Sequence, residues 1–276
     1  MEALAWGYGL VEGPTFARDG SIYFSDVLGG GVHRWSPDGA VETVVPKRRG
    51  VGGMCLHADG GLVVSGRDVS HVKDGETRTL LALEGVTGFN DMATDSAGRV
   101  YVGALRFMPF AGERPVPGEI WRTDGGGQAE ELFGGIDWPN GIGFSPDGGT
   151  IYASDFASGE VVAFEPATGE QRVFAQSPSG DADGLAVDVE GGVWVALGSG
   201  GGIGRFSRKG TLDQVVDVPA GFVSSLCFGG DDMRDLYVTT ADNSEDPARA
   251  GTLFKTRVDV PGLPVAAATV RPPGRA

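Results

Sequence analysis

The sequence predicts an all-β protein, a six-bladed β-propeller, and three observations lead to that fold class. A short segment recurs six times, and the residues at its first position, the column residues, are Glu12, Gly52, Asn90, Asn140, Asp183 and Ser224. These residues are about 40 to 50 positions apart, which is the length of a propeller blade. Glycine makes up 48 of the 276 residues, and such abundance indicates many tight turns between short strands.

Each repeat carries the strands of one blade in a constant order. The column residue opens the first strand, and a turn glycine follows in five repeats, at Gly20, Gly60, Gly98, Gly148 and Gly191. Asp232 takes that place in the sixth repeat. A β-rich second strand comes next, and we expect third strands at 32–35, 71–73, 119–122, 160–164, 202–206 and 252–257. Outer fourth strands are less distinct, with 41–45 and 171–174 as examples.

The first strands alternate between large and small side chains. In the fourth repeat, Ile142 and Phe144 are large, whereas Gly141 and Gly143 between them are small. Successive side chains of a strand point to opposite faces of its sheet. A strand with unlike faces suits a sheet packed between two neighbouring sheets, as a blade in a ring is.

The chain reads as a single propeller domain over residues 1–276. We expect residues 3–10 to pair with the last blade and close the ring, which leaves no long sheet edge exposed. The longest interval between column residues contains an insertion, 106–117, with Pro109, Pro115 and Pro117. Prolines disfavour a strand, so the insertion is expected to form a loop at the mouth of the propeller.

Charge restricts the possible partners. The net charge of −15 and a pI near 4.5 argue against nucleic acid and anionic membrane as partners, because both require a basic surface. The start, Met1-Glu2-Ala3, has no basic region followed by an apolar run, so we expect neither a signal peptide nor a membrane span and favour a cytoplasmic location. A small-molecule partner fits best, and the sequence indicates no oligomeric state.

The column predicts a metal site. First strands of a propeller line its central channel, so Glu12, Asn90, Asn140 and Asp183 should converge and offer only oxygen donors. Such a set suits Ca²⁺, whereas Zn²⁺ and copper favour His or Cys. Gly52 and Ser224 would leave an open side for substrate. The alternative is that these polar residues merely solvate a wet channel, as in propellers that bind proteins.

The repeat pattern places no histidine at a column position. The three histidines, His33, His57 and His71, all lie outside the column. A Ser-His-Asp triad or a histidine-rich zinc site would need at least one of them there. We therefore expect each histidine to be a surface or packing residue.

Several motifs give the chain a resemblance to a known family. They are Glu12-Gly13-Pro14, Phe89-Asn90-Asp91, Trp138-Pro139-Asn140-Gly141-Ile142, Asp183-Gly184-Leu185-Ala186-Val187-Asp188 and Leu236-Tyr237-Val238-Thr239-Thr240. In order and spacing they resemble the gluconolactonase/regucalcin (senescence marker protein) family of six-bladed propellers, which also includes luciferin-regenerating proteins. The resemblance runs nearly from end to end.

The resemblance implies a lactonase with one divalent cation in the channel, often Ca²⁺, with Mg²⁺, Mn²⁺, Zn²⁺ or Fe²⁺ as possible replacements. Glu12, Asn140 and Asp183 match the direct ligands of the family, and Asn90 matches the amide that completes the site or holds water and substrate. Asp183 also matches the proposed general base. The family hydrolyses lactones, commonly of sugar acids, and some members cleave organophosphates.

One departure concerns the substrate. Sugar-lactone members often carry an arginine where this chain has Gly88. Arg106 is a candidate to replace it, while Phe107, Met108 and Phe110 indicate either a more apolar substrate or simple packing of the insertion. The sequence thus predicts metal-assisted lactone hydrolysis. Phosphotriester hydrolysis or another reaction on the same metal site, and a non-catalytic calcium-binding propeller, remain as alternatives.

Overall fold

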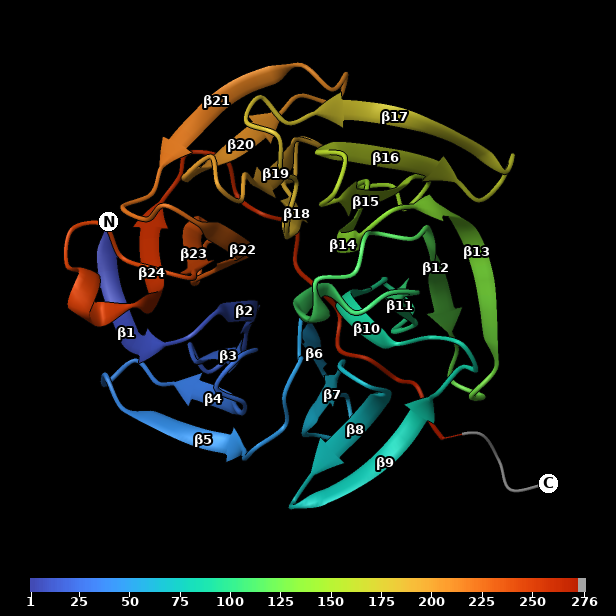
Figure 1. Ribbon diagram of the computed structural model, residues 1–276, viewed down its shortest axis with the longest axis horizontal. Helices are drawn as coiled ribbons and strands as arrows, with labels where there is room; N and C mark the ends of the chain where they lie inside the picture. Colours follow the sequence, from blue (N-terminus) through green and yellow to red (C-terminus); the bar gives the residue numbers. More distant parts are fainter. Residues whose placement is uncertain (273–276) are drawn as a thin grey trace.

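The computed structural model, which describes residues 1–272, consists of six four-stranded antiparallel sheets arranged around a central axis (Figure 1). It is the all-β, six-bladed propeller that the repeats predict. Five blades use four consecutive strands each, numbered from the axis outward. The chain therefore visits the blades in order around the ring.

The first three blades follow the repeats of the sequence. Blade one contains β2 (Val11–Phe16), β3 (Ile22–Asp26), β4 (Val32–Trp35) and β5 (Val41–Val45). Blade two contains β6 (Met54–Leu56), β7 (Leu62–Val64), β8 (Val69–Lys73) and β9 (Glu76–Leu81). Blade three contains β10 (Gly88–Thr94), β11 (Val100–Leu105), β12 (Gly118–Thr123) and β13 (Ala129–Ile136).

The remaining blades complete the ring. Blade four contains β14 (Pro139–Phe144), β15 (Ile151–Asp155), β16 (Glu160–Glu165) and β17 (Glu170–Gln176). Blade five contains β18 (Leu185–Val187), β19 (Val193–Ala196), β20 (Gly202–Phe206) and β21 (Leu212–Asp217). Blade six contains β22 (Val223–Gly229), β23 (Asp235–Thr240), β24 (Gly251–Arg257) and, outermost, β1 (Glu2–Tyr8).

Ring closure joins the start of the chain to its last blade. Strand β1 pairs antiparallel with β24, from Glu2 opposite Lys255 to Tyr8 opposite Gly251. The expected pairing of the N-terminal segment with the last blade is confirmed. Because the first strand becomes the outer edge of the sixth blade, unravelling the ring requires the two ends of the chain to separate.

The small residues of the first strands allow neighbouring blades to approach closely near the axis. A Cβ atom on Gly141 would collide with the backbone of Gly184 and Leu185, and one on Gly184 would collide with Ser225. Larger side chains on the other face fill the space between blades, where Trp194 meets Phe228 edge-on at 5.6 Å. The alternation of small and large residues thus follows from the convergence of strands on one axis.

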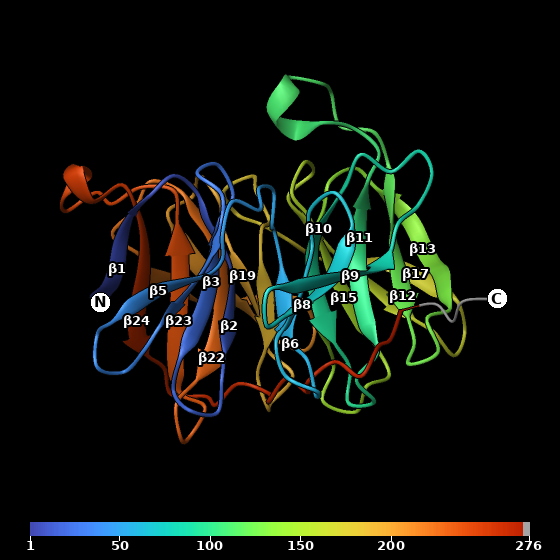
Figure 2. The same cartoon turned by 90° about the horizontal axis from the view of Figure 1, so that it is seen from below.

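The C-terminal segment, residues 258–272, crosses the end of the channel where the first strands finish (Figure 2). Leu263 donates its N–H to Val187 in blade five (2.9 Å), and Ala268 donates to Leu56 in blade two (2.7 Å). Blades two and five lie opposite each other in a ring of six, so the segment spans the axis. This crossing was not predicted, and it leaves the other end of the propeller as the mouth.

The insertion between β11 and β12 forms a loop at that mouth, as predicted. It contains one short 3-10 helix, η1 (Pro109–Ala111), which stands above the rest of the molecule in Figure 2 and over the ring centre in Figure 1. A second short helix, η2 (Pro247–Arg249), precedes β24. Within residues 1–272, no helix is long and apolar enough to cross a membrane.

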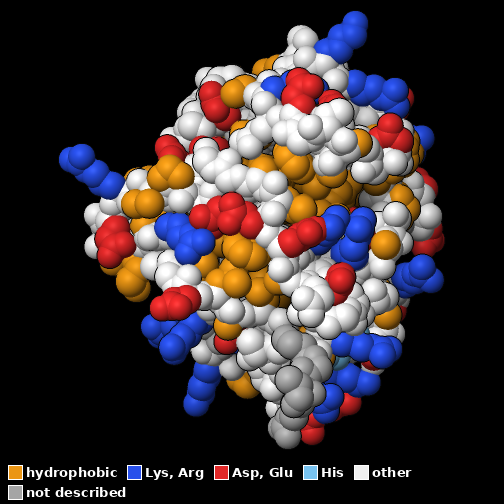
Figure 3. Space-filling model, turned by 90° about the vertical axis from the view of Figure 1, so that its right-hand side faces the viewer, with side chains coloured by type: hydrophobic (Ala, Val, Ile, Leu, Met, Phe, Trp, Pro, Cys, Tyr) orange, Lys and Arg blue, Asp and Glu red, His pale blue; other side chains and the backbone are white. Residues whose placement is uncertain are grey.

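Charged side chains are mixed on the flank of the propeller. On the side drawn in Figure 3, Lys and Arg alternate with Asp and Glu around patches of hydrophobic side chains. Residue pairs such as Arg122 with Glu130 and Arg106 with Glu119 form ion pairs in blade three. The net charge of −15 is therefore not gathered into one acidic patch on this side.

Candidate active site

Four column residues with oxygen donors lie at the mouth end of the channel. Glu12, Asn140 and Asp183 are buried, with exposed fractions of 7 %, 6 % and 3 %, whereas Asn90 is half-buried. Neighbouring first strands are in direct contact: Gly141 donates its N–H to the Asp183 carbonyl (3.3 Å). The Asn90 amide donates to the carbonyl of Pro139, the residue before Asn140 (3.0 Å). Strand convergence thus brings three consecutive column residues, from blades three to five, side by side.

Hydroxyl groups fasten the column peptides across blade boundaries. Ser25 in β3 donates to the carbonyl of Val51, next to the column of blade two (2.5 Å). Ser154 in β15 donates to the Asp183 carbonyl of blade five, and Ser224 in β22 donates to Val11 of blade one (2.5 Å). These serines were not among the predicted site residues. Each one satisfies a buried carbonyl that the ladder within its own blade leaves free.

The open side predicted at Gly52 and Ser224 is absent, and the expectation was wrong. A Cβ atom on Gly52 would collide with the Asn90 amide oxygen, so the glycine makes room for that side chain instead of leaving a gap. Ser224 is fully buried, and its hydroxyl also meets the Thr239 hydroxyl at 3.0 Å. Both residues shape the column from within, and access comes from the mouth.

A third buried carboxyl group, Asp91, belongs to the same region and was missed. It follows Asn90 in β10, is 9 % exposed and accepts the N–H of Met92 (2.7 Å). A Cβ atom on Gly53 of blade two would collide with its carboxylate. The paired glycines Gly52-Gly53 opposite Asn90-Asp91 were the available signal, because two polar side chains can enter the neighbouring strand only where it lacks side chains.

The three buried carboxyl groups hold their protons unusually tightly. Burial, then Asp183 and Asp91, raise the pKa of Glu12 well above its ordinary value. Burial and the neighbouring charges of Asp91 and Asp181 likewise raise the pKa of Asp183, which the Asn140 amide partly offsets. Burial raises the pKa of Asp91 to about 7. None of the three forms an ion pair with a basic side chain within the described residues, so the protein itself supplies no compensating charge.

The donor set fits a hard divalent cation. The Asp183 Oδ1 atom is buried and has no hydrogen-bond partner, which is costly unless another group occupies that position. Asp183 and Glu12 could balance the charge of such an ion, and Asn140 and Asn90 could add neutral oxygens. No group of three His, Cys, Asp or Glu side chains suited to a metal occurs within residues 1–272, and the candidate set instead combines two carboxylates with two amides.

In the structure, the side chains of Arg106 and Phe107 take part in the packing of the insertion. The Arg106 Nε atom donates to both Glu119 oxygens (3.0 and 3.1 Å), away from the column. Phe107 is only 2 % exposed and meets Trp138 edge-on at 5.2 Å. The more apical Met108 and Phe110 are exposed. Phe107 therefore follows the packing alternative, and the Nε atom of Arg106 is committed to Glu119.

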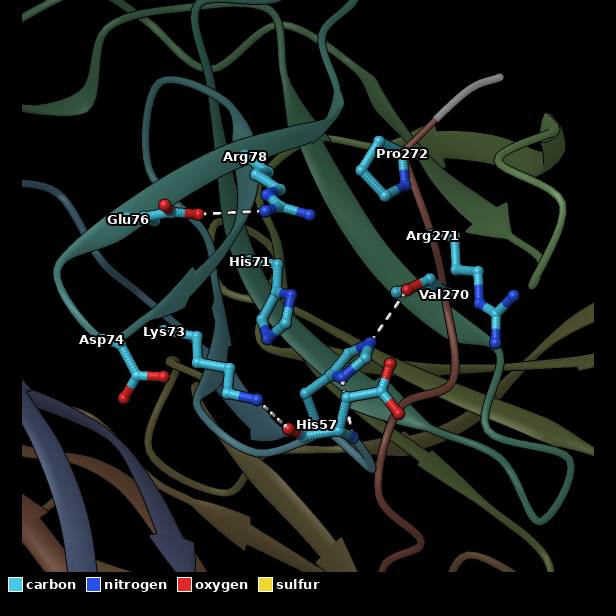
Figure 4. A pocket seen from close by; sticks show the side chains of 10 residues that line it. His57, His71, Lys73, Asp74, Glu76, Arg78, Val270, Arg271 and Pro272 are labelled. Atoms are coloured by element: carbon cyan, nitrogen blue, oxygen red, sulfur yellow. Dashed lines mark hydrogen bonds and ion pairs between the residues drawn. The ribbon is translucent and has the colours of Figure 1, made fainter. Parts of the chain in front are cut away.

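The histidines lie elsewhere, as the sequence indicated. A cavity of about 720 Å³ at the outer edge of blade two is lined by His57 and His71, together with charged side chains and the C-terminal segment (Figure 4). The two imidazole rings stack with centroids 4.0 Å apart. His57 accepts the Asp59 N–H at Nδ1 (3.1 Å), so its Nε2–H donates to the Val270 carbonyl (2.9 Å). His57 fastens the C-terminal segment to blade two, and the histidine pair is separate from the column.

Comparison with known proteins gives the family. The sequence model described as "SMP-30/Gluconolactonase/LRE-like region" matches residues 10–242. The chain belongs to this family. Pentonolactonase XacC of Haloferax volcanii is 32 % identical to it over 284 residues, covering 95 % of each chain. The 6-deoxy-6-sulfogluconolactonase of Pseudomonas putida is 33 % identical over 276 residues, covering 92 % of each chain.

Solved structures agree on the architecture. A luciferin-regenerating enzyme superposes with a TM-score of 0.85 at 23 % identity, covering 97 % of this chain and 98 % of that one. Regucalcin from Agrobacterium tumefaciens, described as a calcium-binding protein, gives a TM-score of 0.82 at 24 % identity and 96 % coverage of both chains. The family resemblance seen in the motifs is confirmed by the sequence matches, and the solved structures show that the fold is shared.

Proposed function

We propose that the protein is a lactonase that opens a lactone ring at the column with the help of one bound divalent cation, Ca²⁺ first among the candidates. Two relatives that are named lactonases align over more than 90 % of this chain, which supports the reaction class. The observation that carries the cation is the buried, unpartnered Asp183 Oδ1 among oxygen donors. The substrate is a small molecule that enters at the mouth.

Four side chains would hold the cation: Glu12, Asn140 and Asp183 directly, with Asn90 completing the set or holding water and substrate. When bound, such an ion supplies Lewis-acid chemistry, polarising the ring carbonyl and stabilising negative charge on its oxygen. Asn90 is the most exposed of the four and so the one best placed to meet the substrate. Mg²⁺, Mn²⁺, Zn²⁺ and Fe²⁺ are the other candidates for this oxygen site.

Asp183 would act as the proton acceptor. Water attacks the lactone carbonyl carbon, its proton passes to the Asp183 carboxylate, and the ring C–O bond breaks to give the hydroxy acid. The proton then returns to the departing alkoxide. Ser154 donates to the backbone carbonyl of Asp183 and holds its peptide, which fixes the position from which the carboxylate would accept the proton. The C-terminal segment crosses the far end of the channel, so substrate and product would both pass through the mouth.

The test is a substrate and metal panel on the full-length protein. Chelated enzyme receives each of the five cations in turn with D-gluconolactone, D-xylonolactone, alkyl-substituted γ-lactones and a phosphotriester. We expect lactone hydrolysis that disappears on chelation, returns with cation and is abolished in Asp183→Ala. Hydrolysis of the phosphotriester alone would favour that alternative, and cation binding without any turnover would favour a non-catalytic role.

A further inference from the structure

A second ring of residues lies above the column. Each first strand runs from the mouth toward the far end of the channel, so the residues two places before each column residue lie nearer the mouth. These residues are Leu10, Gly50, Gly88, Trp138, Asp181 and Phe222. All six are half-buried or exposed, in contrast to Glu12, Asn140 and Asp183. A molecule approaching the column therefore meets this mouth ring first.

Aromatic side chains dominate one side of the mouth ring. Trp138 contacts Phe156, which follows β15, with ring centroids 4.7 Å apart, and Phe156 lies 6.1 Å from Phe222. All three rings are half-buried and so keep a surface toward solvent. The aromatic arc, defined as Trp138, Phe156 and Phe222, runs along blades four to six beside Asn140 and Asp183 of the column.

The backbone of the aromatic arc is fixed by hydrogen bonds. The Trp138 N–H donates to the Asp155 carboxylate (3.0 Å), and the Phe156 N–H donates to the Trp138 carbonyl (3.0 Å). The Phe222 N–H donates to the Asp242 carboxylate (3.2 Å). Phe107 from the insertion supports the far edge of Trp138. The half-exposed rings thus form a preorganised apolar surface, which is the kind that favours binding.

The rest of the mouth ring offers little to a hydroxyl-rich molecule. Gly50 and Gly88 have no side chains, and Asp181 accepts the N–H and hydroxyl of Ser199 at one of its two carboxylate oxygens, Oδ2 (2.9 and 2.6 Å). The Arg106 guanidinium is paired with Glu119. Each hydroxyl of a sugar acid lactone needs a hydrogen-bond partner once it is removed from water, and this ring supplies few.

Given the proposed lactonase function, we propose that the aromatic arc binds an apolar substituent of the substrate. The preferred substrate is then a lactone carrying an alkyl or aryl group. The reacting ring lies over Asn90, Asn140 and Asp183, and the substituent lies along Trp138, Phe156 and Phe222. Aromatic faces pack well against such groups without requiring hydrogen bonds. At Gly88 the mouth ring has no side chain that could bond a sugar hydroxyl.

Kinetics with matched substrates test this assignment. γ-Nonalactone and γ-butyrolactone contain the same lactone ring, and γ-nonalactone carries an additional pentyl chain. D-xylonolactone carries hydroxyl groups in place of that chain. We expect kcat/KM for γ-nonalactone to exceed that for the other two by about tenfold or more. Phe222→Ala should lower it about tenfold while leaving γ-butyrolactone within about twofold, and Phe222→Leu should restore part of it. Val173→Ala, an exposed apolar site on the outer strand β17, is the matched control.

The proposal fails if the wild type prefers D-xylonolactone, or if Phe222→Ala slows both γ-lactones equally. A protein that hydrolyses no lactone would refute the proposed function, and the aromatic arc is then judged by binding alone. Titration with γ-nonalactone should change the tryptophan fluorescence, and Trp138→Phe should abolish that change while circular dichroism shows a folded protein. The assignment is overturned if γ-nonalactone changes the fluorescence of Trp138→Phe as much as that of the wild type, or if it does not change the wild-type fluorescence at all.

Discussion

Replacing Asp91 with asparagine should stabilise the chelated protein at neutral pH. The carboxyl is buried, accepts one peptide N–H, from Met92, and lies near Glu12 and Asp183. Its pKa rises from 3.8 to about 7 on folding, because burial penalises the charged form. A carboxyl group whose pKa is higher in the folded state than in the unfolded state stabilises the folded protein at pH values below its pKa in the unfolded state. This stabilisation is lost as the pH rises toward its pKa in the folded state.

The size of the effect follows from the shift. Each pKa unit corresponds to about 1.4 kcal/mol, so the shift of Asp91 predicts a loss of about 4 kcal/mol between about pH 4 and pH 7. The asparagine side chain would be neutral throughout, keep an oxygen for the Met92 N–H and fit beside Gly53. The variant should therefore match the wild type near pH 4 and exceed it progressively up to about pH 7.

Urea unfolding of chelated protein at several pH values measures this difference. The free energy of unfolding is compared at an unchanged m-value, so that only stability is scored. Asp217→Asn, at the exposed end of β21, provides the control and should show no growing advantage. If the free energy of unfolding depends on pH equally in Asp91→Asn and in the wild type, this carboxyl is not buried without a compensating positive charge, and the reasoning is refuted.

Three further predictions concern positions around the site. Gly52→Ala should displace the Asn90 amide and weaken Ca²⁺ affinity at least about tenfold in calorimetry, whereas unchanged affinity would contradict the close packing. Ala268→Asp, at a fully buried position of the C-terminal crossing, should lower the unfolding free energy by about 2 to 4 kcal/mol in urea, and a stability equal to wild type would mean the crossing is not fastened. Arg106→Gln should leave kcat/KM for unsubstituted lactones within about twofold because the guanidinium is paired with Glu119, and a large loss would restore its role in substrate contact.

The fold was predictable because its signals are local and repeated. Turn glycines at Gly20, Gly60, Gly98, Gly148 and Gly191 all adopt positive φ angles, a conformation that other residues rarely adopt. The alternation of small and large side chains in the first strands reflects convergence on an axis. The C-terminal crossing has neither signal, because its contacts involve irregular backbone, and only the burial of Ala268 and Val270 in three dimensions identifies it.

The column residues were accessible to sequence reasoning because each occupies the same position of a repeat. Asp91 escaped because it is one residue out of that register, and its proximity to Glu12 and Asp183 depends on a neighbouring strand of glycines. Arg106 and Phe107 lie in a proline-rich insertion, where no periodicity predicts side-chain direction. The mouth ring, by contrast, could have been read from the same repeat by counting back two residues from each column residue.

Calorimetric titration of Ca²⁺ into chelated protein, with lactone hydrolysis followed on the same samples, tests the central claim most directly. We predict one binding site per chain in the wild type, turnover that rises with its occupancy, and loss of both in Asp183→Ala with circular dichroism unchanged. Turnover that persists in the chelated wild type, or tight binding with wild-type rates in Asp183→Ala, would contradict the assignment of the column as the catalytic cation site.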